Sequence, residues 1–343
     1  MPASSSMTEN IAAELVGGDW DPVVAPVRDF LNRVSGRLEE QVALFEPEIA
    51  EYARYALENQ GKQLRPTLVA LAGGAVGPLN ESSVTIAVII EMIHLATLVH
   101  DDIMDEARIR RRRPTLANRW GNDVAVLLGD CLFAHALRLA AELSANDVCR
   151  LVALSSGRVC SGEILQTRRR RRWTVTRPDY FKVIEMKTAE LFGLSCELGA
   201  RLSGATTAEA AALRDYGLAL GTAYQIYDDC LDLFGAEAVA GKSLGTDLAS
   251  GKVTLPLIVF FERASEAERA RMVGWLESWS SDRFSDVRRE LDGKNALGES
   301  RRVIGEFLNA ADCSLSIVKA GPESDALSAM NRFLARQTAL LAG

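Results

Sequence analysis

The stretch VTIAVIIEMIHLATLVHDDIMDEARIRRRR, residues 84–113, joins a long apolar segment to three aspartates and then to four consecutive arginines. The apolar part is slightly too short to span a membrane and contains one acid and one histidine, so a buried helix explains it better. Such a helix would end with Asp101, Asp102 and Asp105 in a cavity or cleft, where unpaired charge is expensive. The stretch therefore predicts a core helix that ends at a polar site.

The remaining sequence has the same helical character. Apolar residues recur at helical spacing along most of the 343 residues, 48% of which are hydrophobic, and period-two alternation is rare. Short Gly, Pro and Asn-rich segments separate the helical stretches, and no tract is long enough to be a linker between domains. We expect one all-α domain over residues 21–343. Residues 1–20 are polar and lack the apolar region of a signal peptide, so we expect a disordered start.

The overall charge limits the classes of partner. A formal net charge of −7 argues against a general nucleic-acid binder, so any site for an anion must be built locally. The six cysteines include no CxxC pair and are typical of a reduced, cytoplasmic protein.

A second acidic cluster has the same spacing as the first. The segment YDDCLD, residues 227–232, places Asp228, Asp229 and Asp232 at the end of another apolar helical run. The first and last aspartates of a DDxxD segment project from the same face of a helix, where they repel each other unless cations compensate them. Oxygen-only ligand sets suit Mg²⁺, which is commonly shared with substrate phosphates, and no His or Cys at ligand spacing supports zinc.

Basic side chains stand at several further places along the chain. A diphosphate held by metal ions needs additional cations, although each of these residues taken alone is explained as well by a solvated surface. Their occurrence together with two acidic clusters favours a diphosphate site. The segments are GKQLRP with Lys62 and Arg65, the pair Arg110 and Arg111, MKTAELF with Lys187 and Thr188, and the glycine-rich GKSLGTDLASGKVTLP with Lys242, Asp247 and Lys252.

With these motifs the chain resembles the polyprenyl synthetase family of trans-isoprenyl diphosphate synthases. The matching segments, between residues 61 and 256, are GKQLRP, HDDIMDEARIRR, GDCLFA, GEILQ, MKTAELF, YQIYDDCLDLFG and GKSLGTDLASGKVTLP. The resemblance implies an all-α isoprenoid synthase bundle around a deep central cavity, usually in a homodimer. It further implies the Mg²⁺-dependent, head-to-tail condensation of isopentenyl diphosphate with an allylic diphosphate to an all-trans polyprenyl diphosphate.

The resemblance also implies roles for individual residues. A lone histidine on an apolar helix is more often a packed core residue, but His94 lies two turns before Asp101, at the family's substrate position. Three Mg²⁺ ions would be bound directly by Asp101, Asp105 and Asp228, and the supporting or water-mediated ligands would be Asp102, Asp229 and Asp232. The implied residues for the allylic diphosphate are Arg110, Lys187, Thr188, Gln225, Lys242 and Lys252, of which Lys187, Thr188, Gln225 and Lys242 are catalytic. Those for isopentenyl diphosphate are Lys62, Arg65, His94 and Arg111.

The length of the product is argued from the helix before the first cluster. Residues Thr97, Ala96 and Ile93 precede Asp101 by four, five and eight positions and would line the path of the growing hydrocarbon. None of them is aromatic, whereas short-chain members of the family typically block this path with a ring. We therefore expect a long-chain product, such as a quinone side-chain precursor. The alternatives are a farnesyl or geranylgeranyl diphosphate synthase and a terpene cyclase, which would not need GKQLRP for a second diphosphate.

Two groups of arginines depart from the family pattern. Arg112 and Arg113 follow the functional pair, and their role is open. The run TRRRRRW, residues 167–173, is explained either as a solvated loop or as a contact with an anionic membrane surface that helps to release a greasy product.

Overall fold

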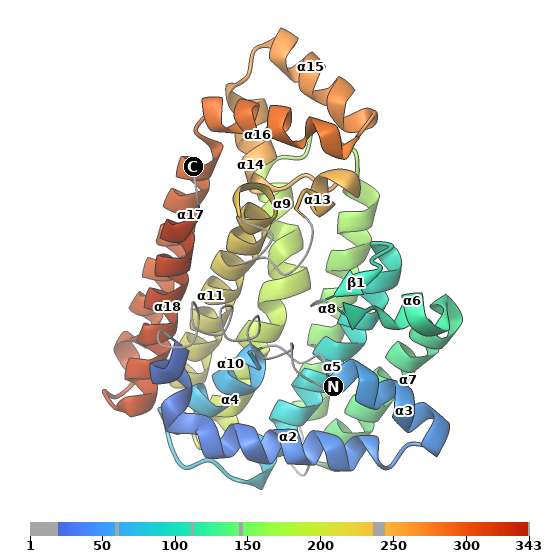
Figure 1. Ribbon diagram of the computed structural model, residues 1–343. Coiled ribbons are helices and arrows are strands. Elements are labelled where there is room, and N and C mark those ends of the chain that lie inside the picture. Colours follow the sequence, from blue (N-terminus) through green and yellow to red (C-terminus); the bar gives the residue numbers. More distant parts are fainter. Residues whose placement is uncertain (1–19, 59–61, 111–112, 144–146, 236–243, 342–343) are drawn as a thin grey trace, which may run out of the picture.

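The computed structural model describes residues 20–58, 62–110, 113–143, 147–235 and 244–341, and the all-α prediction is confirmed (Figure 1). In this described part of the chain the strands are limited to one hairpin, in which β1 (Ile109–Arg110) pairs antiparallel with β2 (Arg113–Pro114). The hairpin places the ends of the arginine run on extended backbone, outside any helix.

The helices follow one another with short connections. Their bounds are α2 (Arg28–Val42), α3 (Pro47–Leu57), α4 (Leu64–Gly74), α5 (Glu81–Met104), α6 (Leu116–Trp120), α7 (Asn122–Glu142), α8 (Val148–Arg169), α9 (Arg177–Ile184), α10 (Glu190–Leu202), α11 (Thr207–Phe234), α13 (Thr246–Ala249), α14 (Leu255–Arg263), α15 (Glu266–Glu277), α16 (Phe284–Gly293), α17 (Ala296–Ser314) and α18 (Pro322–Leu340). Three 3₁₀ turns, η1 (Ala25–Val27), η3 (Ser281–Arg283) and η4 (Leu315–Ile317), and one π-helical turn, η2 (Glu185–Ala189), complete them.

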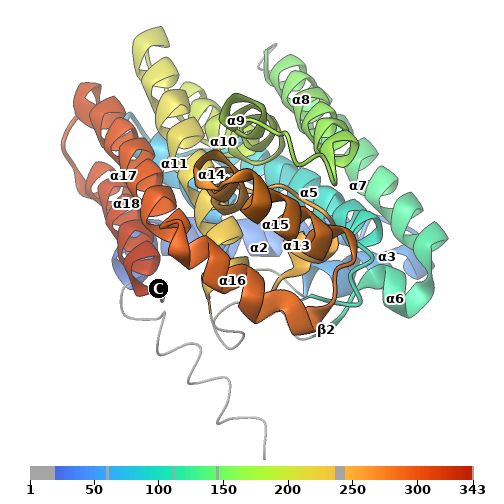
Figure 2. The ribbon, with the colours of Figure 1, turned by 90° about the horizontal axis from the view of Figure 1, so that it is seen from above.

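One helix, α10, lies at the centre of the bundle, where it packs against α4, α5, α8 and α11. Viewed from above, α7 and α8 flank one side, and α17 and α18 flank the other (Figure 2). A continuous apolar core runs from Val23 to Leu341. Helices α5 and α7 have the length and composition of a membrane span, but α5 is mostly buried inside the bundle, as the sequence predicts.

Side chains in the short segments between helices fix where several helices start. Asn80, Thr176 and Thr206 each cap a helix by accepting a hydrogen bond from the backbone three residues later, and each forms a reciprocal capping box. These contacts satisfy backbone donors that a helix start leaves free. The caps therefore set where α5, α9 and α11 begin, and two of those helices carry the acidic clusters.

Part of the segment MKTAELF departs from the regular α-helix. Lys187 and Thr188 lie in the π-helical turn η2, between α9 and α10. Glycines of the flanking helices let this turn be packed tightly: a Cβ atom on Gly162 of α8 would lie 2.7 Å from the Lys187 backbone nitrogen, and one on Gly221 of α11 would lie 2.7 Å from the Ala189 Cα. Single π turns are frequent at functional sites, and here the turn is fixed from two sides.

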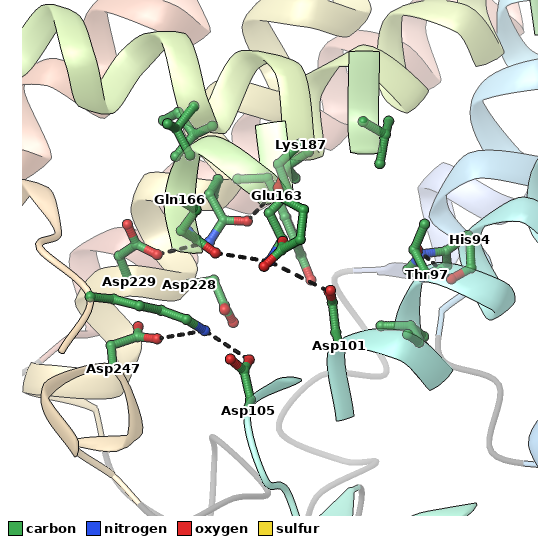
Figure 3. Close-up of a pocket in the computed structure, with 18 of the residues that line it drawn as sticks. His94, Thr97, Asp101, Asp105, Glu163, Gln166, Lys187, Asp228, Asp229 and Asp247 are labelled. Atoms are coloured by element: carbon green, nitrogen blue, oxygen red, sulfur yellow. Dashed lines mark hydrogen bonds and ion pairs between the residues drawn. The ribbon is translucent and has the colours of Figure 1, made fainter. Parts of the chain in front are cut away.

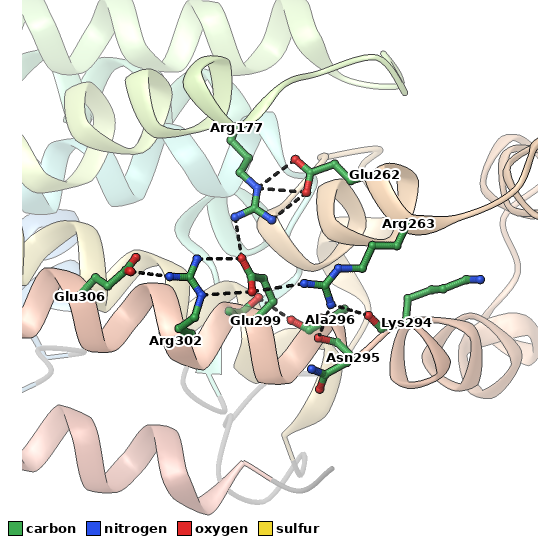
Figure 4. Close-up of polar contacts among 10 residues, drawn as sticks. Arg177, Glu262, Arg263, Lys294, Asn295, Ala296, Glu299, Arg302 and Glu306 are labelled. Carbon is green, nitrogen blue, oxygen red and sulfur yellow. Dashed lines mark hydrogen bonds and ion pairs between the residues drawn. The ribbon is translucent and has the colours of Figure 1, made fainter.

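An ion-pair network fastens α9, α14 and α17 together (Figure 4). Arg177 donates to Glu262 at 2.7 Å and to Glu299 at 2.9 Å. Glu299 also accepts from Arg302 at 2.9 Å and from Arg263 at 3.3 Å. One largely buried carboxylate thus serves three guanidinium groups and holds the start of α9 in place.

We predict that Glu299→Gln lowers the free energy of unfolding by about 1–2 kcal/mol at neutral pH, because three arginines lose one charged acceptor. Hydrogen bonds from Arg302 and Arg177 lower the pKa of Glu299 from 4.5 to about 2. This carboxylate therefore stabilises the fold above pH 4.5, and its contribution is lost as the pH falls toward about 2.

Urea unfolding followed by circular dichroism measures the free energy of unfolding of the variant and of the wild type. Glu306→Gln is the matched control, because exposed Glu306 pairs with Arg302 only four residues away in the same helix. We expect the control substitution to lower the free energy of unfolding by less than about 0.5 kcal/mol. Equal effects of the two substitutions would contradict a special role for Glu299.

Candidate active site

A cavity of about 1880 Å³ lies within the bundle and is lined by both charged and apolar side chains. Ordinary small-molecule pockets hold roughly 300–1,000 Å³, so this cavity has room for a large or extended substrate. Apolar side chains from α5, α7, α8, α10 and α11 form much of the wall. They include Leu95, Leu98, Phe133, Val159, Ile164, Leu191, Phe192 and Leu220.

Asp101, in the last turn of α5, faces this cavity and has little contact with solvent (Figure 3). Its carboxylate lies 3.6 Å from the ammonium group of Lys187. Burial raises the pKa of Asp101, and Lys187 opposes that shift. The negative end of the α5 dipole adds to the cost of this charge, so the position attracts cations.

Asp105, which follows the last residue of α5, is held by two cations. Lys252 donates to Oδ2 at 2.8 Å, and Arg170 donates to Oδ1 at 2.7 Å. Burial alone would raise the pKa of Asp105, but Lys252, Lys187 and Arg170 outweigh it and lower the pKa. Lys252 also lies 3.5 Å from Asp247 and so joins the first cluster to the loop before α14 (Figure 3).

Asp228 and Asp229 of the second cluster also line the cavity. Asp229 is buried and accepts hydrogen bonds from Tyr180 at 2.6 Å and from Gln225 at 2.8 Å. Burial raises the pKa of Asp229 to about 8, and Asp247 adds to the shift. Gln225 in turn accepts from Thr188 at 2.8 Å, so a chain of hydrogen bonds connects η2 with α11 and α9.

The remaining two cluster residues, Asp102 and Asp232, are buried and are not part of the cavity wall, although both belong to the predicted metal set. Asp102 accepts from Arg110 at 2.7 Å and thereby fixes the hairpin, while Arg110 lines the cavity. Asp232 accepts from Thr246 at 2.8 Å and from the Asp247 backbone at 3.0 Å. Both carboxylates support cavity-lining elements in this structure.

Lys187 is oriented by two side chains of the GEILQ segment. Glu163 forms an ion pair with its ammonium group, and Gln166 accepts a hydrogen bond from it at 2.9 Å (Figure 3). GEILQ is one of the segments that resemble the family, but the sequence assigned no role to Glu163 or Gln166. Their spacing of three places them on the same side of α8, and this spacing was the available signal.

The predicted isopentenyl diphosphate residues Lys62, Arg65 and His94 all line the cavity. The Lys62 ammonium group lies 4.6 Å from the ring centre of Phe333, and the Arg65 guanidinium group lies 4.9 Å from that of Phe192. Two further predicted substrate residues, Arg111 and Lys242, lie outside the described residues, as does Arg112.

The predicted chain-length positions are divided. Thr97 lines the cavity, and its hydroxyl group donates to the His94 carbonyl at 2.7 Å. Ile93 and Ala96 are completely buried in the core and are not part of the cavity wall, contrary to our expectation that all three line the path. Leu95 and Leu98 line it from the same helix, because the cavity-facing side of α5 is rotated relative to the predicted one.

The arginine run 168–172 is only partly a loop. Helix α8 continues to Arg169, which donates to Asp179 at 2.7 Å, and Arg170 reaches Asp105. Arg168 and Arg172 are exposed. A simple solvated loop, one of the two explanations of the run, is therefore wrong for Arg169 and Arg170.

The donor set fits Mg²⁺ and a diphosphate. Among the described residues, no three acidic, His or Cys side chains meet closely enough to enclose a metal ion by themselves. The cavity instead offers carboxylates from two helices with lysines and arginines close by. Mg²⁺ is commonly bound through one or two carboxylates, waters and substrate phosphates, so phosphate oxygens would complete such a site.

Comparison with known proteins agrees with this arrangement. The sequence pattern of the Polyprenyl synthetase family matches residues 46–290. The chain is 34% identical to octaprenyl diphosphate synthase of Escherichia coli over 81% of this chain and 87% of that protein. It is 33% identical to nonaprenyl diphosphate synthase of Mycobacterium tuberculosis over 89% of this chain and 92% of that protein. It is 32% identical to a short chain isoprenyl diphosphate synthase of Methanothermobacter thermautotrophicus over 89% and 94%.

Solved structures show the same fold. A decaprenyl diphosphate synthase from Rhodobacter capsulatus superposes with a TM-score of 0.88 at 32% identity, over 93% of this chain and 99% of that one. A polyprenyl synthase from Caulobacter crescentus, complexed with calcium and isoprenyl diphosphate, superposes with a TM-score of 0.87 at 30% identity, over 97% and 99%. The chain belongs to the polyprenyl synthetase family and is a prenyltransferase of the polyprenyl diphosphate synthase type.

Proposed function

We propose that the chain makes a long-chain all-trans polyprenyl diphosphate from isopentenyl diphosphate and an allylic diphosphate, with Mg²⁺. The observation that carries the proposal is the cavity of about 1880 Å³, whose wall combines carboxylates, lysines and arginines suited to Mg²⁺ and diphosphate with aliphatic side chains suited to a hydrocarbon chain. The relatives named octaprenyl, nonaprenyl and decaprenyl diphosphate synthases support a long product. A short product is the second candidate, because a relative named as a short-chain synthase is nearly as similar.

In this proposal Asp101, Asp105 and Asp228 hold the Mg²⁺ ions. Three Mg²⁺ ions are bound when the substrate is present. Bound Mg²⁺ would neutralise the charge that develops on the leaving diphosphate. Asp229 supports the second cluster from within the cavity wall. Asp102 and Asp232 support the site indirectly through the hairpin and the 246–247 segment.

The cationic side chains of the chain divide between two substrates. Lys187, Lys252, Arg110 and Lys242 bind the allylic diphosphate, and the oxygens of Thr188 and Gln225 face the allylic carbon as its C–O bond breaks. Isopentenyl diphosphate, the second substrate, is held without metal. Its double bond attacks the allylic cation, and the released diphosphate then accepts the proton that the product loses. Its binding residues are Lys62, Arg65, His94 and Arg111.

We propose a homodimer in the cytoplasm, joined through α7 and α8. These neighbouring helices lie on one side of the bundle (Figure 2). Both expose large apolar side chains. The exposed fractions are 41% for Val126, 63% for Leu127, 37% for Leu137 and 56% for Leu154. Burial of such a face removes apolar area from water. Contact with a membrane during product release would be peripheral and transient.

We predict that Asp105→Asn and Asp228→Asn each lower the rate of Mg²⁺-dependent product formation about a hundredfold or more, since each removes charge that holds metal at the leaving group. Incorporation of labelled isopentenyl diphosphate into acid-labile product, measured across a range of Mg²⁺ concentrations, tests this. Asp215→Asn, an exposed aspartate earlier in α11, is the control and should keep the wild-type rate. Near wild-type rates in both cluster variants would refute the metal assignment.

We predict that the wild-type enzyme extends farnesyl diphosphate beyond the geranylgeranyl product, and that Thr97→Phe shortens the main product by at least one isoprene unit. A ring at Thr97 would enter the cavity, whereas Thr97→Val removes the hydroxyl group without adding bulk and should keep the product. Sizing of dephosphorylated products by chromatography gives the answer. Accumulation of farnesyl or geranylgeranyl product by the wild type would establish the short-chain alternative.

We predict that Leu127→Glu combined with Leu154→Glu converts the dimer to a monomer, because two charges would be buried at the contact. Light scattering after gel filtration measures the mass. Leu340→Glu, 74% exposed on α18, is the control and should leave the dimer intact. A wild-type monomer would contradict the proposal and would favour a separate partner, as the name of the relative "Heptaprenyl diphosphate synthase component 2" suggests for that protein.

A further inference from the structure

The segment 169–171, at the end of α8, is anchored to three separate elements around the cavity. Arg169 donates to the Asp179 carboxylate at 2.7 Å and to its carbonyl at 2.8 Å. The backbone nitrogen of Arg171 donates to the Gly251 carbonyl at 2.7 Å, next to Lys252. Arg171 adopts a left-handed backbone with a φ of 57°, which is uncommon for a residue with a side chain. Such conformations persist where surrounding contacts enforce them.

Arg170 is the member of this segment whose side chain reaches the acidic cluster. Its guanidinium group donates to Asp105 Oδ1 at 2.7 Å and to the Met104 carbonyl at 3.1 Å, at the C-terminal end of α5. The side chain is 22% exposed and lines the cavity. Its Nε–H is buried and has no hydrogen-bond acceptor, which leaves one donor that a further oxygen could satisfy.

The two oxygens of Asp105 are therefore divided between two cations, Arg170 on Oδ1 and Lys252 on Oδ2. A metal ion that binds this carboxylate must displace or share these partners. A displaced guanidinium group needs another anion nearby, and a diphosphate next to the metal supplies phosphate oxygens that match its geometry.

We propose that Arg170 is a further substrate-positioning residue, which neutralises Asp105 in the empty enzyme and binds a diphosphate oxygen when metal and diphosphate enter together. The inference rests on the proposed metal and diphosphate site. Arg169 and Arg171 hold the segment in place, while Arg170 changes partners. Arg170 thus competes with a metal ion that arrives alone and assists one that arrives with a diphosphate.

The test is Arg170→Gln, which removes the charge and keeps a polar side chain. Isothermal titration calorimetry measures two affinities: that for Mg²⁺ alone, and that for inorganic diphosphate in the presence of Mg²⁺. We expect Mg²⁺ alone to bind about two- to fivefold more tightly, because a competing ion pair is lost. We expect inorganic diphosphate with Mg²⁺ to bind about tenfold more weakly, because a charge-assisted hydrogen bond is lost.

Two further variants make the result specific. Arg172→Gln removes the same charge from an exposed position two residues later and should leave both affinities unchanged. Arg170→Lys keeps the charge and should fall between wild type and Arg170→Gln in both titrations. Circular dichroism and the melting temperature confirm that each variant is folded.

The opposite directions of the two changes decide the matter. If both affinities fall, Arg170 only shapes the site, and if neither changes, it has no part in binding; either result overturns the inference. These outcomes are separate from a failure of the proposed function. If wild-type enzyme binds no diphosphate with Mg²⁺, the proposed site itself is wrong, whereas tight wild-type binding with an unchanged Arg170→Gln variant refutes only the role of Arg170.

Discussion

The structure depends on one electrostatic constraint: two buried helices, α5 and α11, carry carboxylates in their C-terminal parts that face the same cavity. The C-terminal end of a helix carries partial negative charge, so the dipole of α5 adds to the repulsion that Asp101 and Asp105 experience. Buried like charges are tolerated only where cations compensate them. In the described part of the chain Lys187 and Lys252 supply that compensation from two other elements, the π turn and the loop before α14.

The surrounding fold keeps these cations in position. Lys187 lies on a π turn that the glycines of α8 and α11 allow to be closely packed, and Glu163 and Gln166 orient its side chain. Asp232 holds α13, which precedes the loop that carries Lys252, through backbone and side-chain hydrogen bonds. A site whose ligands are fixed by their neighbours loses little free energy to reorganisation when substrate arrives. The carboxylates of one cluster thus divide into those that face the cavity and those that support it.

The helical character of the chain and both acidic clusters could be predicted from the sequence, because helical spacing acts over a few positions. The prediction also kept Asp102 in the metal set as a supporting ligand, because spacing alone does not give the direction of a side chain in the folded bundle; in the structure Asp102 contacts Arg110 of the hairpin and does not line the cavity. The same limit explains Ile93 and Ala96, whose direction depends on the rotation of α5 in the bundle. Arg170 lay beyond prediction because its partner, Asp105, is 65 positions away in the sequence. The π turn has no spacing signal of its own.

The pairing of the carboxylates with lysines has a consequence for how Mg²⁺ and diphosphate affect each other's binding. Mg²⁺ alone would take carboxylate oxygens from Lys252 and Lys187 and leave those cations unpaired in a largely buried wall, which is costly. A diphosphate alone would attract the same lysines and leave the carboxylates unpaired. When metal and diphosphate enter together, the carboxylates pair with metal and the lysines pair with phosphate, so no buried charge is left without a partner. The two ligands should therefore strengthen each other's binding by the same factor, because a coupling free energy between sites is reciprocal.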